Sequence, residues 1–162
     1  MPNTTYTLTA PSSFLANFKA VTKMGLSVSV VFSSIAGYLL AAEIVHFPTL
    51  VLLAVGGYFM VGASNVFNQI IERDLDALMD RTKNRPIPTG RMSVTYAFVL
   101  AVILTVTGLS ILYNINERTA MFGAISICLY TSAYTPLKTK TPLSVFVGAI
   151  PGAIPFMLGW VA

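Results

Sequence analysis

Five long stretches without a charged side chain divide this 162-residue sequence and leave few folds open to it. A transmembrane helix needs about 20 mostly apolar residues, and each stretch has about that length or more. The stretches are residues 24–42, 44–71, 92–116, 119–137 and 141–162. We therefore predict an all-α, polytopic transmembrane helical bundle, with spans near residues 24–42, 48–70, 94–113, 119–136 and 143–161. These five spans form a single membrane domain over residues 1–162, which begins with a polar tail at 1–13.

The composition excludes most alternatives to a protein of the lipid bilayer. Hydrophobic residues make up 55% of the chain and charged residues only 10%, whereas about 25% of an ordinary soluble domain is charged. Too little polar surface remains to cover a water-soluble globule, so a soluble single-domain enzyme is excluded. The single cysteine, Cys128, excludes an intrachain disulfide and a cysteine-ligated metal. The net charge of +4 comes without a basic run interleaved with aromatic residues, so we expect no nucleic-acid partner.

The positive charges predict how the chain is oriented in the membrane, because short loops rich in Lys and Arg stay in the cytoplasm. Nine of the ten Lys and Arg residues precede the first span or follow the second and fourth spans, and only Arg118 falls on the other side. The expected location is the cell (inner) membrane, crossed several times, with the N-terminus in the cytoplasm and the C-terminus outside.

The loop between the second and third expected spans concentrates the charges, since residues 72–91 hold four of the six carboxylates and five of the ten cations. If the helix continues past Ile71, four polar residues spaced by four share one face. This polar stripe consists of Asn68, Glu72, Asp76 and Asp80. Neighbouring carboxylates repel unless a cation neutralises them. Hard oxygen ligands favour Mg²⁺, which bridges one or two carboxylates to substrate phosphates.

The polar stripe is therefore a candidate Mg²⁺ site with Asn68, Glu72, Asp76 and Asp80 as ligands. Three cations that follow it are candidates for binding phosphate oxygens. These cations are Lys83, Arg85 and Arg91. A charged loop is also typical of any cytoplasmic connection that only fixes topology, so the spacing alone leaves both interpretations open.

The same segment resembles the UbiA-type intramembrane prenyltransferase superfamily. The first acidic motif of that superfamily reads Asn-x-x-x-Asp-x-x-x-Asp, and an Arg-Thr-x-Asn-Arg-Pro-x-Pro-x-Gly run follows it. Asn68, Glu72 and Asp76 take the three motif positions, with Glu in place of the usual second Asp, and residues 81–91 match the run nearly throughout. Residues 134–138, 140–144 and 147–155 are similar to one branch of the superfamily, the protoheme IX farnesyltransferases or haem O synthases.

The resemblance implies a Mg²⁺-dependent reaction at the cytoplasmic face of the membrane. Asn68, Glu72 and Asp76 would be the catalytic residues that hold Mg²⁺ and farnesyl diphosphate, and the farnesyl group would pass to a vinyl group of haem b, giving haem O. Five further residues would bind the diphosphate or the haem propionates. These are Lys83, Arg85, Arg91, Tyr134 and Lys138.

The resemblance also implies a second half. Members of the superfamily have about nine spans and a second Asp-rich loop between spans six and seven, whereas this sequence contains only the first motif. We expect the chain to represent the N-terminal half of such an enzyme and to have no transferase activity alone. Two other functions remain open: a quinone-type aromatic prenyltransferase, and a non-catalytic membrane assembly or transport protein whose charges only anchor its topology.

Overall fold

The structure, a computed structural model, describes residues 13–162, so the expected polar tail at 1–13 lies almost entirely outside the described residues. Within the described range every regular element is a helix, which confirms the all-α class. In chain order these are α1 (Phe14–Val21), α2 (Met24–Ala41), α3 (Phe47–Ile71), α4 (Arg73–Leu78), α5 (Val94–Tyr113), α6 (Glu117–Cys128), the π-helix η1 (Leu129–Tyr134), α7 (Thr135–Leu137) and α8 (Ser144–Trp160).

Among residues 13–162, four helical rods are long and apolar enough to cross a membrane: α2, α3, α5 and the continuous rod Glu117–Leu137 made by α6, η1 and α7. The fifth expected span corresponds to α8, which is apolar but has only 17 residues. All five predicted segments agree with the helices to within two residues at each end. Four of the five predicted spans are therefore confirmed as candidate membrane crossings, and the fifth is not.

α3 lies at the centre of the bundle and packs against α2, α5 and α6. The face that α5 buries repeats every three or four residues, which is the spacing of one helical face. This face consists of Ala97, Ala101, Leu104, Gly108 and Leu112. On the outside of the bundle, large apolar side chains such as Phe32, Phe47 and Phe146 are at least 70% exposed, as lipid-facing positions are.

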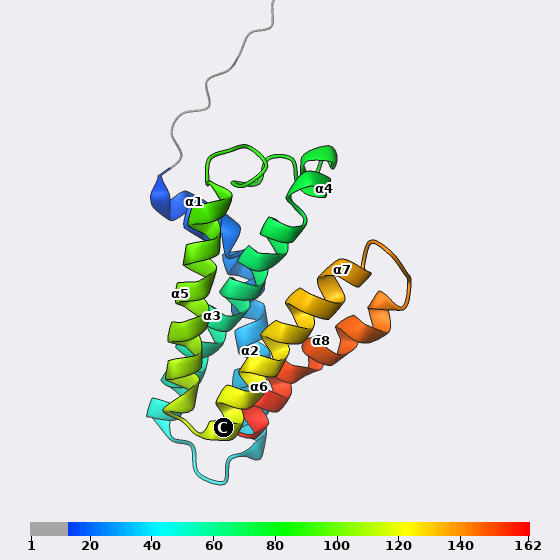
Figure 1. Cartoon of the computed structure of the whole chain (residues 1–162). Helices are drawn as coiled ribbons and strands as arrows, with labels where there is room; N and C mark the ends of the chain where they lie inside the picture. The colour runs from blue at the N-terminus through cyan, green and yellow to red at the C-terminus, as the bar shows by residue number, and fades with distance from the viewer. Residues whose placement is uncertain (1–12) are drawn as a thin grey trace, which may run out of the picture.

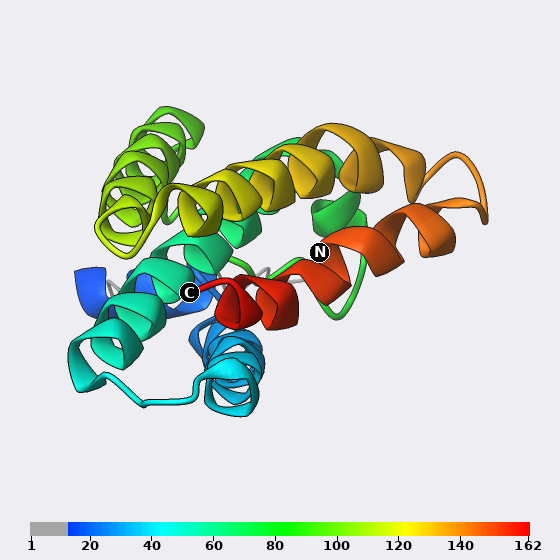
Figure 2. The same cartoon turned by 90° about the horizontal axis from the view of Figure 1, so that it is seen from below.

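The rod formed by α6, η1 and α7 runs beside α8 (Figures 1 and 2). Both the rod and α8 lean away from α5 toward the connection between α7 and α8. α8 returns to the bundle by crossing α2, where two glycines remove the side chains that would separate the backbones. A Cβ on Gly37 would lie 2.2 Å from Phe156 O, and a Cβ on Gly159 would lie 1.8 Å from Ser34 O. This crossing therefore depends on glycine at both positions.

The helix connections separate by charge. α1, α4, the loop after α4 and the α7–α8 connection lie at one end of the bundle, which we call the charged end (Figure 1). The α2–α3 and α5–α6 connections and the C-terminus lie at the opposite end, which we call the far end. The sequence expectation that nine of the ten Lys and Arg residues share one side agrees with this arrangement of the connections.

Candidate functional site

Three residues of the polar stripe lie where α3 gives way to α4. α3 ends at Ile71, and Glu72 leaves the helical conformation with φ −92° and ψ 7° before α4 begins. Backbone hydrogen bonds from Glu72 N–H to Asn68 O (2.9 Å) and from Asp76 N–H to Glu72 O (2.8 Å) preserve the helical register across the junction. Asn68, Glu72 and Asp76 are therefore brought together as predicted, and they are only 2%, 6% and 3% exposed.

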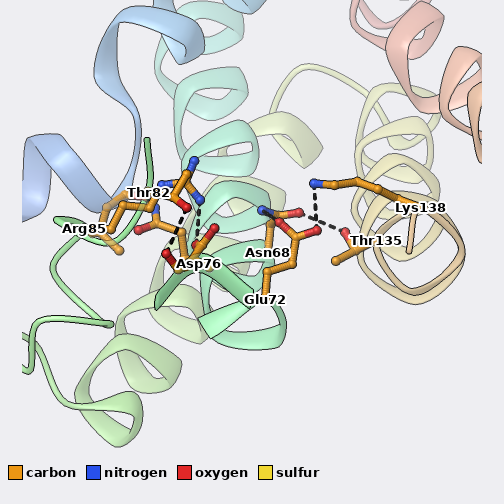
Figure 3. A network of polar contacts seen from close by, with 9 residues as sticks. Asn68, Glu72, Asp76, Thr82, Arg85, Thr135 and Lys138 are labelled. Atoms are coloured by element: carbon orange, nitrogen blue, oxygen red, sulfur yellow. Dashed lines mark hydrogen bonds and ion pairs between the residues drawn. The ribbon is translucent and has the colours of Figure 1, made fainter. Parts of the chain in front are cut away.

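Each of the two buried carboxylates is paired with a cation from another segment of the chain (Figure 3). Lys138 Nζ, just after α7, lies 2.7 Å from Glu72 Oε1, and Arg85 Nη1, in the loop after α4, lies 2.6 Å from Asp76 Oδ2. Asn68 Nδ2 donates to Glu72 Oε2 at 2.9 Å. A buried charge without a partner is costly, so these pairs stabilise the ligand-free site.

The loop after α4 is fixed to the site by its own side chains. The Thr82 hydroxyl donates to Asp76 O at 3.0 Å, and Thr82 is 2% exposed. Ile87 and Met92 are buried in the hydrophobic core, and Gly90 takes the left-handed φ of 72° that turns the chain toward α5. These contacts place Arg85 over Asp76.

The paired residues line a polar cavity of about 190 Å³. Its charged lining comprises four cations and two carboxylates. These are Lys23, Arg81, Arg85, Lys138, Glu72 and Asp76. Because positive charge is in excess and the lining is partly shielded from water, this polar cavity favours an anionic ligand.

The sequence singled out neither Arg81 nor Lys23 as a cavity residue, and Lys23 lies far from the acidic motif along the chain. It follows α1 and takes a left-handed backbone conformation, φ 49° and ψ 57°, which is unfavourable for a residue with a Cβ atom. Two buried amides of α3 hold the preceding residues, since Gln69 Nε2 donates to Val21 O at 2.6 Å and Asn65 Nδ2 donates to Thr22 O at 3.2 Å. These contacts fix the turn that directs Lys23 toward the polar cavity.

The charge of Lys23 is unfavourable in the ligand-free site. It forms no ion pair among the described residues. Burial lowers the pKa of Lys23 below its ordinary value, and the charges of Arg85 and Lys138 lower it further, against the opposing effect of Glu72 and Asp76. Strained backbone and an unpaired cation in one cavity are features that functional sites accumulate.

A larger groove of about 510 Å³ adjoins the polar cavity and shares Tyr130 and Lys138 with it. The groove lies between α2, α3, η1 and α8, and its lining is mostly apolar or small. Tyr134 forms one wall, where its ring packs so closely on Gly148 that a Cβ there would lie 2.6 Å from the ring. The two spaces together suit a ligand with an anionic head and an apolar tail.

Three predicted site residues lie outside both spaces. The prediction that Asp80 shares the face of the stripe is wrong, because α4 ends at Leu78 and Met79 is extended. The Asp80 side chain is 96% exposed and forms an ion pair with Lys83 at 2.6 Å. Arg91 is exposed and donates to Thr89 Oγ1 at 3.0 Å and to Asn84 O. The structure thus groups Arg85 and Lys138 with the acidic motif, places Tyr134 in the adjoining groove and separates Asp80, Lys83 and Arg91 from both.

The side chains at the junction fit part of a Mg²⁺ site. They offer hard oxygen atoms, and Glu72 Oε1 is buried without a hydrogen bond of good geometry although Lys138 Nζ is close to it. In residues 13–162 no group of three or more His, Cys, Asp or Glu side chains is placed to hold a metal. Mg²⁺ commonly uses one or two carboxylates and takes its other ligands from water and substrate phosphates. The two carboxylates at the α3–α4 junction therefore suffice as the protein ligands from this chain.

Known proteins resemble this chain in sequence and in fold. The sequence profile described as the UbiA prenyltransferase family matches residues 30–162. A Protoheme IX farnesyltransferase of Christiangramia forsetii is 72% identical over 151 residues, which cover 93% of this chain and 50% of that protein. A second, from Flavobacterium psychrophilum, is 68% identical and covers 96% of this chain and 53% of that protein.

A solved structure of a UbiA homolog from Archaeoglobus fulgidus, bound to DMAPP and Mg2+, has the same fold. Its TM-score is 0.80 at 18% sequence identity, over 89% of this chain and 53% of that chain. This chain spans about half the length of the curated relatives it matches. The match of the profile to most of the chain shows that it belongs to the UbiA prenyltransferase family.

Proposed function

We propose that this chain forms the first half of a Mg²⁺-dependent intramembrane enzyme that transfers a farnesyl group from farnesyl diphosphate to a vinyl group of haem b. The observation that carries the proposal is the polar cavity beside Asn68, Glu72 and Asp76, which adjoins the apolar groove. A prenyl diphosphate has the same division into a charged head and an apolar tail. The names of the relatives favour haem b as the acceptor over a quinone precursor.

In this proposal Asn68, Glu72 and Asp76 hold the metal together with the diphosphate oxygens, and exposed Asp80 is not a ligand. When bound, Mg²⁺ would neutralise the charge that develops on the leaving diphosphate. Arg85 and Lys138 balance the carboxylates in the ligand-free site. The same two cations would bind diphosphate oxygens, with Lys23 as a third cation.

The groove would receive the farnesyl chain. Tyr134 lines the groove, where it would orient the bond between farnesyl C1 and the diphosphate oxygen. That bond breaks with departure of diphosphate, and C1 forms a carbon–carbon bond with the haem vinyl group. Water then adds to the remaining carbocation and loses a proton. Exclusion of water from the groove before this step protects the reactive allylic cation.

We further propose that α8 is the fifth crossing and that the charged end faces the cytoplasm, with the chain in the inner membrane as one domain. The cation-rich connections support this orientation, since such loops remain cytoplasmic. Exposed apolar side chains of α8 that lie outside the groove, such as Phe146 and Ile150, support contact with lipid.

The half of the relatives that has no counterpart in this chain would supply the remaining metal ligands and cover the groove. We therefore expect purified residues 1–162 to form no haem O from farnesyl diphosphate, haem b and Mg²⁺. Co-expression with the C-terminal half of the Christiangramia forsetii relative should produce haem O, detected by mass. Haem O from the chain alone would contradict the need for a second half. Prenylation of a quinone precursor in place of haem by the two halves would support the quinone-type alternative.

A further inference from the structure

The π-helix η1 brings the Thr135 hydroxyl against the amide of Asn68, a contact between residues far apart in the sequence (Figure 3). Thr135 is 1% exposed. Its Oγ1 lies 2.8 Å from Tyr130 O and 3.2 Å from Asn68 Oδ1. π-Helical turns are rare and concentrate at functional sites, so this contact is a candidate for a role in the site.

The single hydroxyl proton of Thr135 decides whether Thr135 donates a hydrogen bond to Asn68 or accepts one from it. A threonine hydroxyl has one proton, and Tyr130 O is purely an acceptor at the shorter distance. The proton therefore goes to Tyr130 O, and Thr135 Oγ1 presents only lone pairs toward Asn68. A group that accepts in this way is best matched by the N–H of the Asn68 amide.

The other terminal atom of Asn68 lies 2.9 Å from Glu72 Oε2, which also only accepts. Asn68 thus stands between two acceptors, and its single NH₂ group can point to only one of them. Without a metal, the charged Glu72 takes the N–H, because hydrogen bonds to charged groups are the stronger ones. With the amide reversed, Nδ2 donates to Thr135 Oγ1, while Oδ1 and Glu72 Oε2 become neighbouring acceptors that need a cation between them.

We infer that Thr135 is a positioning residue for the metal ligand Asn68: it accepts the amide N–H and so turns the amide oxygen toward the metal. The inference rests on the proposed function, since it assigns a partner to a ligand of the proposed Mg²⁺ site. Outer partners of this kind fix the orientation of metal ligands, and their loss typically weakens metal binding by about 10–100-fold.

The test measures binding of Mn²⁺, in the presence of inorganic pyrophosphate, to the purified chain by electron paramagnetic resonance. Thr135→Val keeps the volume and removes the acceptor, and we expect it to weaken Mn²⁺ binding by about tenfold or more. Thr135→Ser restores the acceptor and should restore the affinity. The melting temperature without metal should change little in Thr135→Val, because Thr135 N–H still donates to Tyr130 O.

The matched control is Thr131→Val in the π-helix that precedes Thr135. Thr131 donates to Ile127 O at 2.7 Å and lines neither the polar cavity nor the groove. This variant should bind Mn²⁺ as the wild type does. Asn68→Asp provides a second test, since both of its terminal atoms are oxygens. In that background Thr135→Val should change the affinity by less than about twofold, against tenfold in the wild type.

The possible outcomes separate this inference from the proposed function. Wild-type affinity in Thr135→Val, with Mn²⁺ bound normally by the wild type, overturns the role of Thr135 and leaves the metal site intact. Equal losses in Thr135→Val and Thr131→Val, or no recovery in Thr135→Ser, overturn it as well, because they indicate a packing effect. Absence of Mn²⁺ binding by the wild type overturns the proposed metal site and the inference together.

Discussion

At the far end of the bundle, Asn116 caps α6 by accepting from Thr119 N–H at 2.8 Å, and it donates to Val161 O at 2.8 Å. At the charged end, Asn68 lies between Glu72 and Thr135, two groups that compete for the same N–H. The first asparagine satisfies backbone groups that a helix end exposes. The second is surrounded by side chains, and one of its two orientations needs a cation.

The two ends also differ in their charged side chains. The far end carries few charges, and Asn116 caps α6 in the α5–α6 connection. The charged end buries two carboxylates, pairs them with cations of other segments and still contains an excess of positive charge around the polar cavity. Asn116 at the far end thus satisfies backbone groups, whereas we propose that the polar groups at the charged end bind a ligand. Variants at the two ends should therefore affect different measurements.

The largest effect is expected from Asp76→Asn at the charged end. It removes a proposed metal ligand and leaves Arg85 without its partner, so binding of a non-hydrolysable farnesyl diphosphate analogue with Mg²⁺ should weaken by about 100-fold or more. Calorimetric titration measures this loss. Asp80→Asn is the matched control, and it should bind normally because Asp80 is 96% exposed. Equal losses in both variants would contradict the division between the two aspartates.

The far end should respond to Gly159→Ala in stability. The added Cβ would lie 1.8 Å from Ser34 O, so α2 and α8 must separate, at a cost of about 1–3 kcal/mol in the free energy of unfolding. Gly152→Ala, in the same helix with open space around its Cβ, should cost far less. Thermal unfolding in detergent compares the two. An unchanged melting temperature in Gly159→Ala would show that the crossing tolerates separation.

Lys23→Met should have opposite effects on stability and on binding. It removes a cation that burial and the neighbouring charges disfavour, so the melting temperature without ligand should rise. It also removes a proposed diphosphate contact, so affinity for the analogue should fall about tenfold. Lys19→Met, on the exposed face of α1, is the control for both measurements. A lower melting temperature with unchanged affinity would assign Lys23 a structural role instead.

The smallest effect is expected from Lys83→Met. Lys83 is half exposed and pairs only with Asp80 outside the polar cavity. An exposed ion pair contributes about 0–1 kcal/mol, so both stability and affinity for the analogue should stay close to wild type. A large loss of affinity would show that the loop after α4 closes over the ligand and brings Lys83 to the diphosphate.

Much of the fold could be predicted because charge-free length determines where a helix can cross a membrane. The segments predicted at 94–113 and 48–70 match α5 and α3 almost residue for residue. The i, i+4 spacing also predicted the shared position of Asn68, Glu72 and Asp76. The prediction failed at Asp80, where the helix ends two residues earlier and nothing in the spacing marks that end.

Long-range contacts could not be derived from spacing. Lys23 reaches the polar cavity because Asn65 and Gln69 hold the turn before it, over more than 40 residues of sequence. The amide side chains of Asn65 and Gln69 inside a mostly apolar span were a usable signal, since buried polar side chains need partners. Thr135 was hidden in the same way, because its contact with Asn68 depends on the π-helix that precedes it.

The most direct test of the central claim is a structure of the chain with Mn²⁺ and a non-hydrolysable farnesyl diphosphate analogue, with the metal located by anomalous scattering. The account predicts a metal peak within bonding distance of Glu72 and Asp76, with the diphosphate near Arg85 and the farnesyl chain along the groove beside Tyr134. A metal peak away from these carboxylates, or an analogue bound outside the groove, would contradict it.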